Sequence, residues 1–172
     1  SLTGIIMPVS TNKGPDKDAK IDDIPSSYRR MRIGGPFASF NGPLFGQLDD
    51  EGLSMGFSVE ERHLNPVGIC HGGMLMTLAD MQLGVGSMAR TKAWEFLPTV
   101  NMTCDFVQAS PMGAFIFGTT DIIRVTKNLL FSSCILWHGE EPVFRGSGIM
   151  KRAGKDETRT VDLERFFEPA EA

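Results

Sequence analysis

The sequence has little cysteine, no excess of basic residues and no long apolar run. Its three cysteines are an odd number set in apolar surroundings, which argues against a disulfide framework and indicates free thiols in a reducing compartment. Lys and Arg number 17 against 21 Asp and Glu, so the net charge of −4 gives no support for nucleic-acid binding. The longest apolar stretch, Met74–Ala89, is too short and too polar to span a bilayer. We therefore expect a soluble cytoplasmic protein.

Composition and patterning divide the chain into three parts. With 41% hydrophobic and 22% charged residues, the 172-residue chain can form the core of one domain. Residues 1–27 mix Gly, Pro, Lys, Asp and Ser without periodicity, which is typical of a flexible arm. Residues 153–172 form a highly charged tail, in which we expect a short surface helix at 161–167. The folded domain is therefore predicted to span residues 28–152.

Alternation of apolar and polar residues at period two predicts strands through the middle of the chain. The clearest are Leu53–Val59 and Val100–Phe106, and a further strand is expected within residues 37–48. Lys127-Asn128 and Gly139–Pro142 have turn chemistry and separate more β-rich runs. These runs span residues 115–125, 129–138 and 143–151. Because short turns join successive strands, the pattern predicts an antiparallel sheet.

One segment departs from this alternation. Met74–Ala89 is apolar almost all round, which predicts a helix enclosed by the rest of the protein. At about 100° per residue, its small and polar residues form one narrow stripe, and Gln82 lies on the opposite side. The stripe consists of Gly73, Thr77, Asp80, Gly84 and Ser87. Helix and strands together predict an α+β fold, an antiparallel sheet wrapped around one long helix.

Asp80 is the only charged residue between His71 and Arg90. Isolated aspartates inside proteins are rare because an unpaired charge is costly to remove from water. Such a carboxylate can serve as a general base or as a nucleophile, with its reactivity set by partial desolvation. The alternative is a structural carboxylate that hydrogen-bonds a neighbouring strand or helix.

The helix is preceded by two glycines, Gly72 and Gly73, which leave backbone N–H groups open to a ligand. With the helix dipole, this end could polarise a carbonyl as an oxyanion hole, although a Gly-Gly pair is equally consistent with a tight turn. Gly73 and Asp80 are separated by about 10 Å of helix rise. If both act on one substrate, Asp80 should therefore come from a second copy of the chain. A two-fold dimer with antiparallel helices would supply it.

These residues, taken together, resemble a known family. The matching residues are Asn65-Pro66-x-Gly68-x-x-His71-Gly72-Gly73, then Leu78-Ala79-Asp80 and a strand beginning Thr99-Val100-Asn101. This pattern resembles the hotdog-fold acyl-CoA thioesterases of the PaaI-like (phenylacetic acid degradation) branch. The resemblance covers about residues 37–152. It implies a hotdog fold, an acyl-CoA substrate and a homodimer or a dimer of dimers with sites at the subunit interface. It implies no cofactor beyond the coenzyme A of the substrate.

The resemblance also implies roles for individual residues. The Gly72 N–H would polarise the thioester carbonyl, and Asp80 of the partner subunit would act as nucleophile or general base. Asn65 and His71 would shape the same pocket, and Thr99 would help to position water. Gly73 and Thr77, on the same helix stripe, are taken as substrate contacts.

Other polar residues carry weaker predictions. Arg124, Lys127 and Arg145 lie near predicted strand ends, where they could meet coenzyme A phosphates, although ordinary surface charge is the favoured interpretation for any one of them. We expect Cys70 to be packed rather than nucleophilic. His63, Cys70, His71 and Asp80 do not match a zinc-binding helix spacing, so no metal site is predicted.

Three functions remain distinguishable. Acyl-CoA hydrolysis is the leading hypothesis, and Asp80 favours it. A non-catalytic hotdog module that binds acyl-CoA or lipid would have no use for a carboxylate at this position. Hydration of an enoyl-CoA would need an Asp/His pair on a differently placed helix motif, which the sequence lacks. The acyl group is not specified by the sequence, since ten methionines and twelve phenylalanines suit aromatic and long-chain pockets alike.

Overall fold

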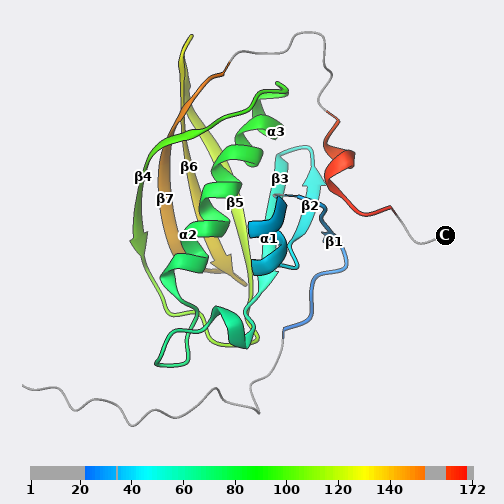
Figure 1. Cartoon of the computed structure of the whole chain (residues 1–172), viewed down its shortest axis with the longest axis vertical. Coiled ribbons are helices and arrows are strands. Elements are labelled where there is room, and N and C mark those ends of the chain that lie inside the picture. Colours follow the sequence, from blue (N-terminus) through cyan, green and yellow to red (C-terminus); the bar gives the residue numbers. More distant parts are fainter. Residues whose placement is uncertain (1–21, 34, 154–161, 170–172) are drawn as a thin grey trace, which may run out of the picture.

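The computed structural model describes residues 22–33, 35–153 and 162–169. Within these residues, seven strands form one antiparallel sheet in the order β1-β2-β3-β5-β6-β7-β4 (Figure 1). The strands are β1 (Arg29–Arg30), β2 (Phe45–Asp49), β3 (Gly52–Ser58), β4 (Thr99–Phe106), β5 (Phe115–Val125), β6 (Leu129–His138) and β7 (Glu141–Lys151). Strand β4 comes directly after the helix in the chain but pairs with β7, so it forms one edge of the sheet.

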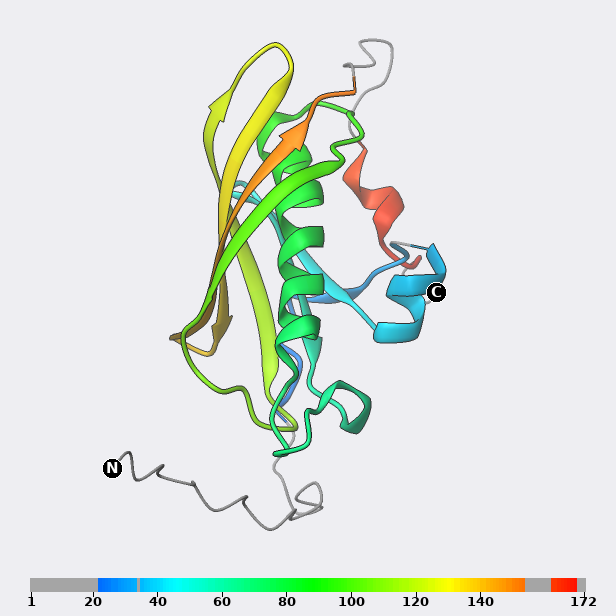
Figure 2. The same cartoon turned by 60° about the vertical axis from the view of Figure 1, so that its left-hand side comes forward.

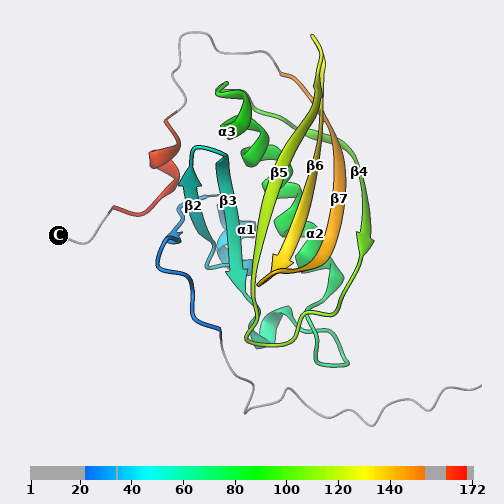
Figure 3. The same ribbon diagram turned by 180° about the vertical axis from the view of Figure 1, so that it is seen from behind.

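One long helix lies along a single face of this curved sheet (Figure 2). It is built from α2 (Gly72–Met81), a π-helical turn η2 (Gln82–Gly86) and α3 (Ser87–Thr91). Leu78 and Leu83 are fully buried and pack with the inward residues of the strands, such as Phe57 and Phe144. The opposite face of β5, β6 and β7 carries no helix among the described elements (Figure 3). The predicted α+β arrangement, a sheet wrapped around one helix, is confirmed.

The π turn changes which residues share a face. Asp80 and Gln82 lie on opposite sides of the helix, as the stripe predicted, with Gln82 fully buried. Asp80 is exposed in the single chain, whereas partial desolvation was expected. Ser87, however, is fully buried, although it was placed on the stripe with Asp80. A π turn contains one residue more than an α turn and therefore rotates everything after it by about 100°. The stripe consequently ends near Gly84.

Gln82 fastens the helix to the sheet where β3 and β5 separate, since their pairing begins only at Met55. Its Oε1 accepts from the Met55 N–H at 2.8 Å, and its Nε2 donates to the Leu53 carbonyl and to Thr120 Oγ1, each at 2.7 Å. The Thr120 hydroxyl in turn donates to the Gln82 carbonyl at 2.9 Å. A Cβ added to Gly86 would lie 2.3 Å from Thr120 Oγ1, so only glycine fits beside this network.

Substitution of Gln82 by leucine is expected to destabilise the protein by about 2–5 kcal/mol. Leucine fills a similar volume but leaves the Met55 N–H and the Leu53 carbonyl buried without this partner. The measurement is the urea midpoint at fixed protein concentration. Gln108→Leu, at an exposed position, is the control and should change the midpoint little. Equal midpoints for the two variants would contradict this role of Gln82.

The segment before β2 corrects one prediction. Residues 37–48 were expected to form an interrupted strand, but α1 (Gly35–Asn41) is a helix, and only Phe45–Asp49 is a strand. Asn41 Nδ2 donates to the Phe37 carbonyl one turn earlier. The helix ends at Asn41, because Gly42 precedes a proline and helical geometry is disfavoured there. The aromatic residues Phe37 and Phe40 remain largely exposed, so they did not mark a buried strand face.

Both ends of the described chain contact the sheet. Asp22 accepts from the Phe115 N–H and lies 2.8 Å from His138 Nε2, although it falls within the predicted flexible arm. The rest of that arm, residues 1–21, lies outside the described residues. Near the other end, a 3₁₀ helix η3 (Leu163–Phe166) lies within the predicted helical region 161–167. No helix in the described residues is both long and apolar enough to cross a membrane.

Candidate active site

The loop before the central helix is held by Asn65. Its Oδ1 accepts from the backbone N–H groups of Val67 and Ile69 at 3.1 and 3.3 Å, and its own N–H donates to the Ile69 carbonyl. The amide oxygen is therefore fully used within the loop. The Asn65 Nδ2 group has no acceptor among the described residues and is available as a donor.

His63 stabilises the same loop through hydrogen bonds of its ring and its backbone. Burial lowers the pKa of this histidine, so the ring is neutral at pH 7. Its Nδ1 accepts from the Glu60 N–H at 2.9 Å, which leaves Nε2 to donate to the Asn41 carbonyl at 3.0 Å. The His63 carbonyl then accepts from the His71 N–H at 2.7 Å. This chain of bonds sets the direction in which the backbone enters the helix.

The helix start exposes one backbone donor. His71 caps α2, because its Nδ1 accepts from the Gly73 N–H at 2.8 Å. No acceptor among the described residues takes the Gly72 N–H. A Cβ at Gly72 would lie 2.6 Å from the Phe106 ring, so the ring approaches the backbone as only glycine permits. Of the two predicted N–H donors, Gly72 is free to bind a ligand, whereas Gly73 is engaged by His71.

Asn65 and Gly72 line one pocket of about 350 Å³, the helix-start pocket. Its other walls come from the helix, through Leu75, and from Phe106 and the residues that follow β4. The structure therefore brings together two of the predicted site residues that are separated in sequence. His71 stands beside this pocket, exposed, with its Nδ1 occupied by the Gly73 N–H.

Asp80 belongs to a second location along the same helix. The Thr99 hydroxyl donates to Asp80 Oδ1 at 2.6 Å, which leaves Oδ2 without this contact. The pair lines a mostly apolar hollow of about 370 Å³, the Asp80 pocket. On its other side Asp80 faces a hollow of about 330 Å³ that is also lined by Thr77, whose hydroxyl donates to the Gly73 carbonyl. Thr99 and Asp80 are thus neighbours within one chain.

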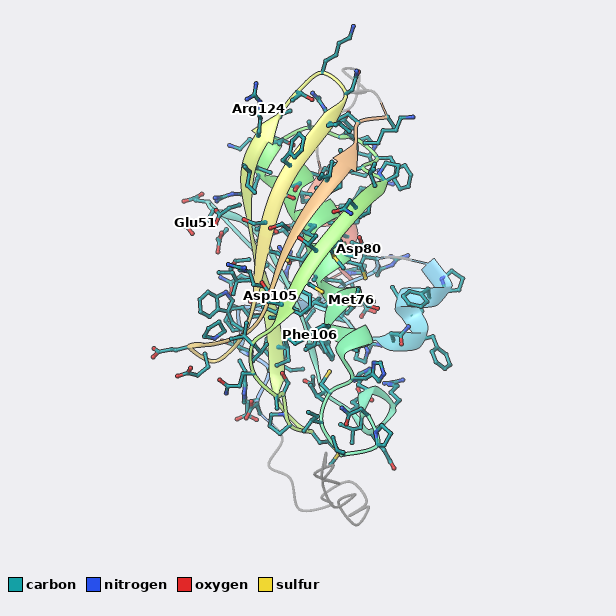
Figure 4. The ribbon with its side chains drawn as sticks, turned by 90° about the vertical axis from the view of Figure 1, so that its left-hand side faces the viewer. Glu51, Met76, Asp80, Asp105, Phe106 and Arg124 are labelled. Carbon is teal, nitrogen blue, oxygen red and sulfur yellow. The ribbon has the colours of Figure 1, made fainter. Side chains whose placement is uncertain are left out.

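Within one chain, the two locations are separate. Asp80 follows Gly72 by eight residues, which corresponds to about 12 Å along the helix. Asp80 lines neither the helix-start pocket nor any wall shared with Asn65. Figure 4 shows the same separation, with Asp80 well along the helix from Phe106, which marks the helix-start pocket. A single chain therefore holds the two halves of the predicted site apart.

The predicted phosphate-binding residues are scattered. Arg145 on β7 donates to Asp105 on β4 at 2.6 and 3.0 Å. Arg124 lies toward the other end of the sheet from Phe106 (Figure 4), and Lys127 occupies the β5–β6 turn next to it. The three residues do not form one cluster, and their role in coenzyme A binding stays a prediction.

Cys70, which lines the helix-start pocket, and Cys134 on β6, whose Sγ lies against the Ala79 carbonyl, are buried thiols. Burial raises the pKa of Cys70 to about 12, so almost none of it is thiolate at pH 7. The expectation that Cys70 is packed is confirmed. In the described part of the chain, no three His, Cys, Asp or Glu side chains gather in a way that could hold a metal ion.

Trp94 and Phe166 were missed by the sequence reasoning. Both line the Asp80 pocket, and their rings stack with centroids 5.8 Å apart and planes 14° apart. They lie far apart in the chain, and neither belongs to a recognisable motif. Only the path of the C-terminal segment over the helix brings them together.

Comparison with known proteins agrees with this fold. Residues 67–144 match the family model of the Thioesterase superfamily. This segment contains Gly72, Asp80 and Thr99, so the predicted resemblance to the hotdog thioesterases is confirmed. The match supports a thioester hydrolase activity in general.

Individual proteins are also similar to this chain in sequence or in fold. A Pseudomonas aeruginosa protein, whose name assigns it only provisionally as an esterase, is 27% identical over 128 residues, covering 74% of this chain and 96% of its own. The PaaI protein of the E. coli phenylacetic acid degradation operon superposes with a TM-score of 0.60 at 20% identity, over 69% of this chain and 85% of its own. A hypothetical Streptococcus pneumoniae thioesterase with coenzyme A gives 0.57 at 17% identity, over 63% and 86%. The structural neighbours establish the hotdog fold.

Proposed function

We propose that this protein is an acyl-CoA thioesterase that acts as a homodimer. Each site would combine Asn65 and Gly72 of one chain with the partner subunit's Asp80 and the partner subunit's Thr99. The Thioesterase superfamily match and the structural neighbour with coenzyme A support the choice of substrate. The observation that carries the proposal is the placement of a free N–H donor and an exposed carboxylate at opposite ends of β4.

Strand β4 supports this pairing of chains. It begins at Thr99, which binds Asp80, and ends at Phe106, which contacts Gly72. Its outer edge is unpaired among the described strands, and Val100 and Phe106 are more than half exposed. A long, exposed and partly apolar edge favours association. If two β4 edges pair antiparallel across a two-fold axis, the Phe106 end of one chain meets the Thr99 end of the other. That pairing brings each helix-start pocket to an Asp80.

The chemistry follows from the two halves. The thioester carbonyl oxygen would accept from the Gly72 N–H and from Asn65 Nδ2, both of which lack acceptors in the described residues. These donors stabilise the negative charge that develops on that oxygen. The partner subunit's Asp80 either removes a proton from an attacking water or attacks the carbonyl carbon itself. In both routes the carbon–sulfur bond breaks, and the coenzyme A thiolate leaves and takes up a proton. With Asp80 as general base, water supplies the new oxygen of the acid. With Asp80 as nucleophile, a mixed anhydride forms and water hydrolyses it at the Asp80 carboxyl carbon, so the acid leaves with an oxygen from Asp80 and Asp80 takes its replacement from water.

Thr99 and His71 have positioning roles in this proposal. The hydrogen bond from Thr99 fixes Oδ1, so Oδ2 of the carboxylate faces the reaction. His71 holds the Gly73 N–H and so fixes the backbone beside Gly72. Arg124 and Lys127 remain candidates for the phosphates of coenzyme A. Arg145 could serve only by giving up its bonds to Asp105.

The direct test is release of free thiol from a panel of acyl-CoA thioesters. Turnover of at least one class of acyl-CoA, with free acid as the second product, is the expected result. Tight binding without release of thiol would instead identify a non-catalytic binding module. Conversion of an enoyl-CoA to its hydroxyacyl-CoA would identify a hydratase.

Asn65→Asp tests the donor half of the site. Aspartate keeps an oxygen for the Val67 and Ile69 N–H groups but replaces the Nδ2 donor by a second oxygen. We expect kcat to fall by about 10²–10³-fold, because a donor to the developing oxyanion is lost and a negative charge is added. The measurement is steady-state thiol release, with thermal unfolding as a check of folding. Unchanged kcat in a folded variant would remove Asn65 from the site.

A further inference from the structure

The Asp80 pocket has the volume and the apolar lining to hold an apolar ligand. Along the helix it extends from Asp80 past Val85 to Met88, which corresponds to about 12 Å of rise. Its other carboxylate, Glu95, is buried and bonded through both oxygens to the Arg152 Nε, so its charge is already paired. The remaining lining is largely apolar, and Asp80 and Thr99 stand together at one end.

Part of the wall of this pocket comes from a C-terminal segment, residues 162–168, which we term the strap. Phe166 of the strap lines the pocket and stacks on Trp94, which follows the end of the helix. The strap lies on the side of the helix away from the sheet (Figure 2). It is outside the segment that matches the Thioesterase superfamily, residues 67–144.

The strap is fixed to the body of the protein by several independent contacts. Its backbone pairs with residues 30–32: the Arg32 N–H donates to the Phe166 carbonyl at 2.7 Å, and the Glu168 N–H donates to the Arg30 carbonyl at 3.0 Å. Phe167 is buried, with the Arg29 guanidinium 4.1 Å from its ring centroid. Strap residue Arg165 lies 4.7 Å from the Trp94 ring centroid, in cation–π range. These contacts therefore fix the position of Phe166 in the lining of the Asp80 pocket.

We infer that the strap closes the acyl-binding pocket and that Phe166 determines how long an acyl group the enzyme accepts. The inference rests on the proposed function, because Asp80 is the residue that would act on the thioester. Two hollows adjoin the Asp80 carboxylate: one runs back along the helix toward Met76, and the larger one, the Asp80 pocket, runs forward to Phe166 and Trp94. With the thioester carbon at Asp80, the larger hollow is the one we assign to the acyl group. The acyl group lies in this hollow, and its last atoms meet the Phe166 ring.

The pocket size sets the class of acyl group. At roughly 30 Å³ for each non-hydrogen atom, the volume that a water occupies in the liquid, about 370 Å³ holds about twelve such atoms. This corresponds to an aliphatic acyl group of about ten carbons or to an arylalkanoyl group of similar size. Met81 and Met88 in the wall can adapt to either shape.

The test measures binding and hydrolysis separately. Binding of non-hydrolysable S-alkyl-CoA thioethers with 4 to 16 carbons is measured by calorimetry for wild type, Phe166→Ala and Phe166→Trp. Wild-type affinity should increase up to about ten carbons and then level off or fall. Phe166→Ala should bind the 14-carbon thioether about tenfold more tightly than wild type does, since each newly buried methylene contributes about fourfold. Phe166→Trp should move the optimum in the opposite direction. Phe131→Ala, on the outer face of β6, is the matched control and should leave the profile unchanged.

The outcomes separate this inference from the proposed function. If Phe166→Ala and Phe166→Trp are folded and both keep the wild-type length profile, or if no thioether binds to wild type, the inference is overturned. If the two variants shift the profile in opposite directions while acyl-CoA is not hydrolysed by wild type, the pocket assignment stands and the proposed catalytic function fails. Hydrolysis whose length optimum shifts in the same two directions supports both.

Discussion

Replacing Asp80 by asparagine should lower kcat for acyl-CoA hydrolysis by about 10²–10⁴-fold, the range that a positioned acid–base group contributes. Asparagine keeps the shape of the side chain and can still accept from the Thr99 hydroxyl through its amide oxygen. It can neither remove a proton from water nor attack the carbonyl carbon. Because Asp80 is exposed and stabilises no buried contact, the variant should fold normally and keep a similar KM. The measurement is steady-state thiol release.

The matched control is Asp50→Asn, at an exposed loop carboxylate between β2 and β3. It removes the same charge away from the site and should keep the wild-type rate. A folded Asp80→Asn variant with the rate of this control would eliminate Asp80 as the reacting group. Single turnover of wild type in H₂¹⁸O separates the two possible roles. Label in the Asp80 carboxylate identifies a nucleophile, whereas general-base catalysis places label in the released acid alone.

The central helix shows what the sequence pattern could predict. An apolar segment with one polar stripe has few stable environments, so its enclosure by a sheet followed from elementary burial arguments. The opposite orientations of Asp80 and Gln82 also followed from helical geometry and are seen in the structure. The predicted position of Ser87 on the polar stripe was wrong, because a π turn adds one residue to the helix and no simple sequence pattern predicts such a turn.

The loop and the helix start were predictable for a different reason. Asn65, His71 and Gly72 lie within a few residues of one another, and their interactions are local: an amide that closes a turn and a histidine that caps a helix. Local hydrogen-bonding preferences are recorded in short sequence patterns. The structure adds that the Gly73 N–H is used by His71, which leaves the Gly72 N–H as the free donor.

Contacts between distant segments were beyond sequence reasoning. The stack of Phe166 on Trp94 and the Arg145–Asp105 pair both depend on the three-dimensional path of the chain. The charged C-terminal region was interpreted as a surface tail because its composition is polar on average. Two adjacent aromatic residues within it, Phe166 and Phe167, in fact anchor it to Trp94, which follows the helix, and to Arg29 of β1. Average composition conceals such anchors when the apolar residues are few.

Gly72 and Asp80 lie at opposite ends of β4, so in the proposed dimer each site combines residues of two chains. The second large expected effect is therefore complementation between two inactive variants. Asp80→Asn chains keep the helix-start pocket, and Asn65→Asp chains keep the carboxylate. If each site draws on two chains, a heterodimer of these variants contains one site with both residues intact and one site with both replaced. Heterodimers purified with two different tags should therefore regain about half of the wild-type kcat per dimer, far above either parent.

This experiment distinguishes a shared site from a site within one chain. In a single-chain site each variant chain carries its own defect, so the heterodimer would be no more active than the mean of the two parents. A second heterodimer is the control, in which both substitutions lie on one chain and the partner chain is wild type. A shared site then pairs every intact half with a damaged one, and activity should be lost, whereas a single-chain site would keep half. The two heterodimers have identical composition, so opposite outcomes can arise only from how the two chains share Asn65 and Asp80.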